Sequence, residues 1–175
     1  DSFKAGHLFS VGLMTVFTRF TQGYRPPEHR DDLMAAICSC NGFDAAALKS
    51  DAETSLAGAS EHSGDDFNTW IKDLRLPEQA HYSRLMAVGL LTLLESAHGE
   101  LKGEDAVELR KKAVEISKEI GMPEARVEKD LGIFASNSER MEQAVELMEE
   151  TLAADRRKKE RRLAEAAEKK QTQSA

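Results

Sequence analysis

Cysteine, proline and aromatic residues are scarce in this chain. The only two cysteines, Cys38 and Cys40, stand two apart, a spacing that matches neither a redox CxxC motif nor a zinc-binding pattern. A disulfide scaffold and a cysteine-based metal centre are therefore excluded, and we expect reduced, structural thiols. Four prolines, 6% aromatic and 31% charged residues are typical of helices. No stretch alternates with period two, so we expect no strand.

The familiar catalytic motifs are also missing. The chain contains no HExxH, GxSxG, P-loop or GxGxxG motif, and its five histidines are scattered. The adjacent carboxylates stand beside expected helix starts, where capping explains them. One polar stretch, from His81 to Arg84, has two interpretations, a capping cluster or part of an assembled catalytic site, and capping is favoured. We therefore predict no enzyme activity, no cofactor and no metal site.

No apolar run is long enough for a membrane span. The two longest runs, around residues 8–17 and 85–94, fall short of the roughly 20 residues that a transmembrane helix needs. We therefore interpret both runs as buried core of a soluble body. The chain starts at Asp1 inside a helical pattern, without a methionine, so we expect a processed form or an expressed fragment.

An internal repeat is the most informative feature that is present. Residues 8–17 read LFSVGLMTVF, and residues 85–94 read LMAVGLLTLL. A second echo, offset by two more residues, aligns the segment 37–51 with 116–130. Repetition of a succession of elements predicts a duplicated supersecondary unit. We place the two units at residues 3–58 and 80–135, with a linker at about 59–79.

Each unit has a pattern of three helices. The first unit predicts helices over about 2–22, over a segment ending near residue 41, and over a segment capped by Asp44. The second predicts helices near 79–98, near 104–120 and from 123 onward. The predicted fold class is therefore all-α, with duplicated three-helix units forming a compact helical bundle and a long projecting C-terminal helix.

Two glycines occupy equivalent positions inside the repeated apolar helices. Gly12 and Thr15 in the first helix correspond to Gly89 and Thr92 in the second. Glycine inside a helix costs about 1 kcal/mol relative to alanine, so two equivalent glycines need a reason. We predict close packing of the two helices, with both glycines near the crossing. The alternative, a membrane dimerisation motif, is disfavoured by the short apolar runs.

The last third of the chain carries a heptad-like seam. Positions 127, 131, 134, 138, 141, 145, 148 and 152 follow four-three spacing and are apolar except for Ser138. We predict one continuous helix, packed through residues such as Leu131, Phe134, Met141 and Val145. The helical body then spans residues 1–152, and residues 153–175 form its projecting basic end. The alternative is a self-associating scaffold or membrane-surface adaptor, in which the seam forms a coiled coil.

Charge is divided along the same line. Residues 1–154 hold 16 basic and 27 acidic side chains, whereas residues 155–175 hold 8 and 4. An acidic body argues against nucleic acid as a partner. The basic end suits an acidic protein surface or an anionic membrane surface, or it is only a solvated helix end. The candidate partner contacts are this end and an exposed turn: Arg156, Arg157, Lys158, Lys159, Arg161, Arg162, Tyr24 and Arg25.

Three ordered blocks carry a family resemblance. Residues 8–26 read LFSVGLMTVFTRFTQGYRP, and residues 82–95 read YSRLMAVGLLTLLE. The third block is VEKDL at 127–131, followed by MEQA at 141–144. Together they resemble the thylakoid formation proteins, also described as photosystem II biogenesis proteins of cyanobacteria and chloroplasts. The resemblance covers about residues 3–165.

The resemblance implies a function that the residues alone do not. It implies an all-helical, non-catalytic accessory factor in photosystem II biogenesis and repair. It also implies a peripheral place on the cytoplasmic or stromal face of the thylakoid membrane, and association with membrane-anchored FtsH proteases. Members of the family have a further N-terminal helical segment, which the present sequence does not contain.

Overall fold

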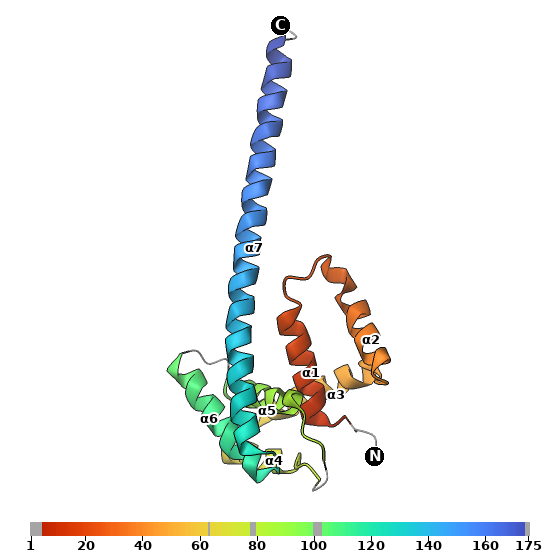
Figure 1. Cartoon of the computed structure of the whole chain (residues 1–175), viewed down its shortest axis with the longest axis vertical. Coiled ribbons are helices and arrows are strands. Elements are labelled where there is room, and N and C mark those ends of the chain that lie inside the picture. The colour runs from red at the N-terminus through yellow and green to blue at the C-terminus, as the bar shows by residue number, and fades with distance from the viewer. Residues whose placement is uncertain (1–4, 63, 78–79, 100–102, 174–175) are drawn as a thin grey trace. The chain divides into compact units, whose positions relative to one another are not determined.

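The structure, a computed structural model, describes residues 5–62, 64–77, 80–99 and 103–173. Within these ranges it contains seven α-helices, one short 3₁₀-helix and no strand (Figure 1). The elements in chain order are α1 (His7–Phe20), η1 (Pro27–His29), α2 (Arg30–Cys40), α3 (Ala45–Glu61), α4 (Asp65–Lys72), α5 (Arg84–His98), α6 (Glu104–Glu119) and α7 (Glu124–Gln173). The predicted all-α class is confirmed.

The chain forms two compact units, residues 1–138 and 139–175. The boundary lies inside α7 and comes earlier than the predicted boundary at residue 152. The first unit contains six complete helices and the start of α7, and the second consists of the rest of α7.

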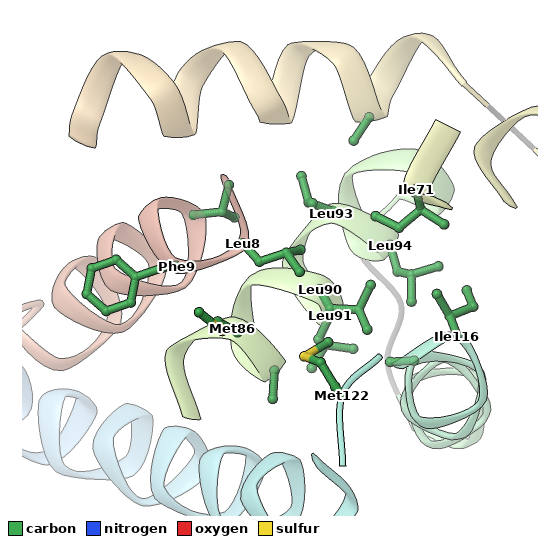
Figure 2. Packing of buried hydrophobic residues seen from close by; sticks show 14 of the residues in the cluster. Leu8, Phe9, Ile71, Met86, Leu90, Leu91, Leu93, Leu94, Ile116 and Met122 are labelled. Atoms are coloured by element: carbon green, nitrogen blue, oxygen red, sulfur yellow. The ribbon is translucent and has the colours of Figure 1, made fainter. Parts of the chain in front are cut away.

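Helix α5 forms the centre of the first unit. Its sequence is apolar nearly all round, and such a helix becomes stable by burying every face. Helices α1, α3 and α6 all pack against α5, and α1 also packs against α3. Figure 2 shows Leu90, Leu91, Leu93 and Leu94 of α5 together with side chains from the surrounding elements. The labelled surrounding residues are Leu8, Phe9, Ile71, Ile116 and Met122.

Helices α1 and α5 approach each other at the two predicted glycines. A Cβ atom on Gly12 would collide with the carbonyl group of Leu85, and one on Gly89 would collide with the carbonyl group of Leu8. The same two Cβ positions lie 3.0 and 3.1 Å from the backbone nitrogen of the opposite glycine. Only residues without a side chain allow this backbone contact. The prediction that both glycines lie at the helix crossing is confirmed.

The contact is reciprocal in the register of the sequence repeat. Leu85 and Gly89 are the repeat equivalents of Leu8 and Gly12, so each half of the contact reproduces the other. The threonines follow the same symmetry, since Thr15 donates to the Val11 carbonyl at 2.8 Å and Thr92 to that of Val88 at 2.9 Å. A pseudo-twofold relation therefore holds between α1 and α5, the first helices of the two sequence repeats. Duplication of the whole three-helix unit stays a prediction.

The predicted linker at 59–79 is wrong in its middle part, because it contains α4. Phe67 and Ile71 of α4 are fully buried in the core, and Trp70 packs against its edge. The apolar residues at 67, 70 and 71 do follow helical spacing. In a helix of only eight residues, however, three apolar positions among polar ones are too few to establish a helical period.

Two helix boundaries follow side-chain capping. Asp44 accepts hydrogen bonds from the backbone N–H groups of Ala46 and Ala47, which confirms it as the cap of α3. At the start of α5, Ser83 accepts from the N–H of Leu85, so this helix begins at Arg84. The predicted start of α5 near residue 79 is therefore wrong, and residues 78–79 themselves lie outside the described ranges.

Helix α7 runs without interruption past Ser138, as the seam predicts. Val127 and Leu131 are buried in the core, and Phe134 packs against it. The Phe134 ring also contacts α1, with its centroid 6.3 Å from that of Phe20. Continuity and packing are thus confirmed for the part of the seam in the first unit. The packing of Met141 and Val145, and the projection of the basic end, stay predictions.

The backbones of α1 and α5 are in direct contact at Gly12 and Gly89. A side chain introduced at either glycine should therefore destabilise the folded protein. Gly12→Leu and Gly89→Leu should each lower the free energy of unfolding by about 1–3 kcal/mol or more, measured by urea-induced loss of helical circular dichroism. Gly132→Ala is the matched control, because Gly132 is exposed inside α7 with no atom within 4 Å of its added Cβ. That change should stabilise by up to about 1 kcal/mol. An unchanged unfolding midpoint for Gly12→Leu would contradict the contact.

Candidate functional site

The basic segment, residues 156–162 of α7, is the largest concentration of charge in the chain. It contains six cations and one carboxylate, Glu160, and all seven residues are exposed. Among the residues that the structure describes, none of the six cations forms an ion pair. One of them, Arg157, donates from Nε to the carbonyl of Ala153 at 3.3 Å. The segment therefore presents its charge to solvent, in the second compact unit.

The second candidate contact, around Tyr24 and Arg25, forms a turn between α1 and η1. The Arg25–Pro26 peptide bond is cis, and the Tyr24 side chain is 39% exposed. Arg25 donates from Nη1 to the carbonyl groups of Gln22 and Tyr24, each at 3.3 Å. The guanidinium thus supports its own turn, while the Tyr24 ring remains open to solvent. The two candidate contacts belong to different compact units, and each is described by itself.

A groove beside this turn was not predicted from the sequence. It has a volume of about 490 Å³ and lies among α1, α2 and α3, with an apolar floor that includes Met14, Phe17 and Met34. Its rim carries two acids and two bases: Glu28, Asp31, Arg30 and Lys49. Arg30 joins the helices, since it donates to Thr21 Oγ1 at 3.1 Å and to the Thr18 carbonyl at 3.2 Å. The floor residues follow helical spacing like core residues, so their pattern did not distinguish a groove.

The polar stretch from His81 to Arg84 forms a structural junction with α7. Tyr82 donates its hydroxyl hydrogen to Asp130 Oδ2 at 2.9 Å, and Arg84 Nε lies 3.3 Å from Asp130 Oδ1. The Asp130 side chain is only 9% exposed, and a buried carboxylate is stable when donors satisfy it. His81 is exposed. The stretch therefore caps α5 and attaches it to α7, which agrees with the favoured interpretation.

A second polar cluster joins α1 to α3. His7 Nδ1 lies 2.6 Å from Asp51 Oδ1, and Ser55 Oγ lies 3.4 Å from the same ring nitrogen. A serine–histidine–aspartate triad uses the two ring nitrogens for different partners. Here both partners meet Nδ1, so this geometry is unsuitable for relaying a proton to the serine.

Two further features would point to a function, a metal-binding cluster and a membrane-spanning helix. Within the described residues, no group of three or more metal-ligating side chains is close enough to hold a metal ion. No helix in the same part of the chain combines the length and apolar character that a membrane crossing requires.

The junction predicts a measurable role for one hydroxyl group. Tyr82→Phe removes the donor to Asp130 and should lower the free energy of unfolding by about 1–2 kcal/mol, since hydrogen bonds to charged groups are among the stronger ones. Tyr24→Phe is the matched control and should change it by less than about 0.5 kcal/mol, because its side chain is exposed. Urea unfolding measures both values. Equal stability of the two variants would show that the Tyr82 hydrogen bond contributes nothing.

The same pair predicts a pH dependence. Burial and the hydrogen bond to Asp130 raise the pKa of Tyr82 above its ordinary value. Above about pH 10 the unfolded chain then loses this phenolic proton while the folded chain keeps it, so folding becomes less favourable as the pH rises. The stability difference between the wild type and Tyr82→Phe should therefore shrink above about pH 10. A difference that stays constant from neutral pH upward would contradict the raised pKa.

Comparison with known proteins identifies the family of this chain. Residues 1–163 match the model of a family described as thylakoid formation protein. The chain is 62% identical over 167 residues to Protein Thf1 of Parasynechococcus marenigrum (strain WH8102), covering 95% of this chain and 77% of that protein. It is 33% identical to Protein Thf1 of Cyanothece sp. (strain PCC 7425 / ATCC 29141), covering 94% and 75%.

A solved structure agrees with the sequence comparisons. The structure of Psb29 superposes with a TM-score of 0.66 at 29% identity, covering 90% of this chain and 78% of that one. All three blocks that carry the resemblance, at 8–26, 82–95 and 127–144, lie within the matched range. The chain therefore belongs to the thylakoid formation protein family.

Proposed function

We propose that this protein is a non-enzymatic accessory factor in photosystem II biogenesis and repair, acting through association with thylakoid FtsH proteases. The observation that carries the proposal is the family match over residues 1–163, because the family is described by thylakoid formation and not by a reaction. The proposed place of action is the cytoplasmic or stromal face of the thylakoid, where the protein binds peripherally. An anionic membrane surface is the alternative partner.

The arrangement of the polar side chains supports a role in binding. Tyr82, Arg84 and Asp130 satisfy one another as a junction between helices, and His7 and Asp51 do the same between α1 and α3. The largest charge concentration, the basic segment, is instead exposed. Exposed and concentrated charge serves recognition of an oppositely charged partner. The basic segment is thus our first proposed contact, and the turn at Tyr24 is the second.

Self-association through the seam is less well supported. Val127 and Leu131, at the start of the seam, are buried in the core of the chain's own first unit. The seam positions outside that unit run only from Met141 to Leu152, which is less than two heptads. A coiled coil requires apolar heptads sustained over about three to four repeats. The remaining seam is therefore too short for a stable coiled coil by itself.

Affinity capture tests the proposed partner. The immobilised 175-residue chain should retain FtsH subunits from thylakoid membranes solubilised in mild detergent, as identified by mass spectrometry. A competing excess of free protein should remove the signal, which separates specific retention from adsorption. Retention of photosystem II proteins without any FtsH subunit would contradict the association with the protease. Light scattering over a dilution series would reveal any homo-oligomer.

Charge reversal tests the contact. Replacing Arg156, Arg157, Arg161 and Arg162 by glutamate should leave folding nearly intact, because exposed substitutions usually change stability by less than about 0.5 kcal/mol. The variant should nevertheless lose retention on thylakoid membranes. Raised salt should weaken retention of the unaltered protein, because exposed charges are screened beyond a Debye length of about 8–10 Å.

The result also locates the contact within the chain. Full retention of the charge-reversed variant at low salt would exclude the basic segment as the docking surface. The helical body, beginning with the turn at Tyr24, would then be the next surface to test.

A further inference from the structure

The six cations of the basic segment point to three sides of α7. Successive residues of an α-helix are turned by about 100°, so side chains three or four apart share a side. The cations therefore form three pairs, which we call stripes: Arg156 with Lys159, Arg157 with Arg161, and Lys158 with Arg162. The directions of the three stripes differ by about 100–150°. Positive charge thus surrounds the helix.

The segment also lacks an apolar face. Its nearest large apolar neighbours along the helix, Leu152 and Leu163, are 40% and 62% exposed. Both lie on the side of the Arg156 stripe, because eleven residues complete about three turns. Cations separate the two leucines, and neither of the other two stripes has a leucine beside it.

This arrangement is unsuited to a membrane surface. A helix that binds in the plane of a membrane has a polar face toward water and an apolar face toward the acyl chains. A flat anionic surface would also contact only one side of the helix, so at least one of the three stripes would remain unused. A protein groove can contact a helix from several sides at once.

The ends of the helix do not explain the charge either. Cations stabilise the C-terminal end of a helix, but this effect falls off within the last turn. The basic segment ends at Arg162, whereas α7 continues to Gln173, about three turns further. The six cations are therefore too far from the helix end to be accounted for by its dipole.

We propose that an acidic groove of a partner protein encloses the basic segment and contacts all three stripes. This inference deepens the proposed function, on which it rests for the existence of a partner. Charge complementarity supports it, since residues 156–162 carry six cations against one carboxylate and are exposed on every side. The partner is thus an acidic protein, and an anionic membrane is the alternative that the experiment tests.

The experiment removes one stripe at a time from the 175-residue chain. The three variants are Arg156→Gln with Lys159→Gln, Arg157→Gln with Arg161→Gln, and Lys158→Gln with Arg162→Gln. Glutamine keeps the helix propensity of the residues that it replaces. The matched control is Arg126→Gln with Lys129→Gln, an exposed pair on the same helix with the spacing of the Arg156 stripe, outside the segment. Circular dichroism verifies that each variant is folded.

Two probes distinguish an acidic polypeptide from a membrane. Fluorescent poly-L-glutamate is a flexible polyanion that can reach every side of the helix, and its binding is followed by anisotropy. Vesicles of phosphatidylglycerol and phosphatidylcholine offer a flat anionic surface, and their binding is followed by flotation. Each stripe variant should weaken poly-L-glutamate binding by a similar factor, about 2- to 30-fold for two lost ion pairs. The control should bind like the wild type.

The outcomes that would overturn the proposal are distinct. If a single stripe carries the whole effect, the contact is one-sided. If the wild type binds the vesicles at least as tightly per anionic group as it binds poly-L-glutamate, a membrane surface is the better partner. If the wild type binds neither probe, the charge only keeps the helix end solvated.

The affinity capture separates this inference from the proposed function. If no FtsH subunit is retained but the three stripes still act equally on poly-L-glutamate, the protease association fails and the enclosing acidic contact stands. If all three stripe variants retain FtsH as well as the wild type does, the association stands and the enclosing contact fails.

Discussion

The backbone contact between α1 and α5 is the constraint on which the first unit depends. With Gly12 and Gly89 at the crossing, the two helices approach more closely than any side chain would allow. This approach lets α5 be covered by α1 on one side while α3 and α6 cover others. The core residues of α5 are then fully enclosed, and burying them is the main source of stability. A larger residue at either glycine would therefore disturb several helix interfaces together.

A polar contact fixes the start of α7 in the same unit. Asp130 is nearly buried, and its two oxygens meet Tyr82 and Arg84, which stand just before and at the start of α5. Val127 and Leu131, on either side of Asp130, are buried in the core. Apolar packing of these two residues stabilises the contact between α7 and the core. The Asp130 carboxylate restricts the register of α7 against α5, because a shifted helix would leave the carboxylate without its hydrogen-bond donors.

Those parts of the fold were predictable from the sequence in which the local residue pattern matches the packing seen in the structure. Equivalent glycines in two apolar helices predicted the crossing, and the seam predicted that α7 continues past Ser138. Helix α4 was missed because its apolar residues are few and surrounded by polar ones, so its helical character depends on burial of Phe67 and Ile71. The partner of Tyr82 was missed as well, since it lies 48 residues away and no local spacing connects them.

The basic segment could be found from the sequence because a run of charged residues is visible without knowledge of the fold. The groove among α1, α2 and α3 could not, since the same helical spacing describes Met14 whether it lines a groove or a closed core. The contrast between paired polar groups in the first unit and exposed charge on α7 supports the proposed role in binding. In the first unit, Asp130 pairs with Tyr82 and Arg84, and Asp51 with His7, between helices. The cations of residues 156–162 form no ion pair within the described chain, so their charge is available to an external partner.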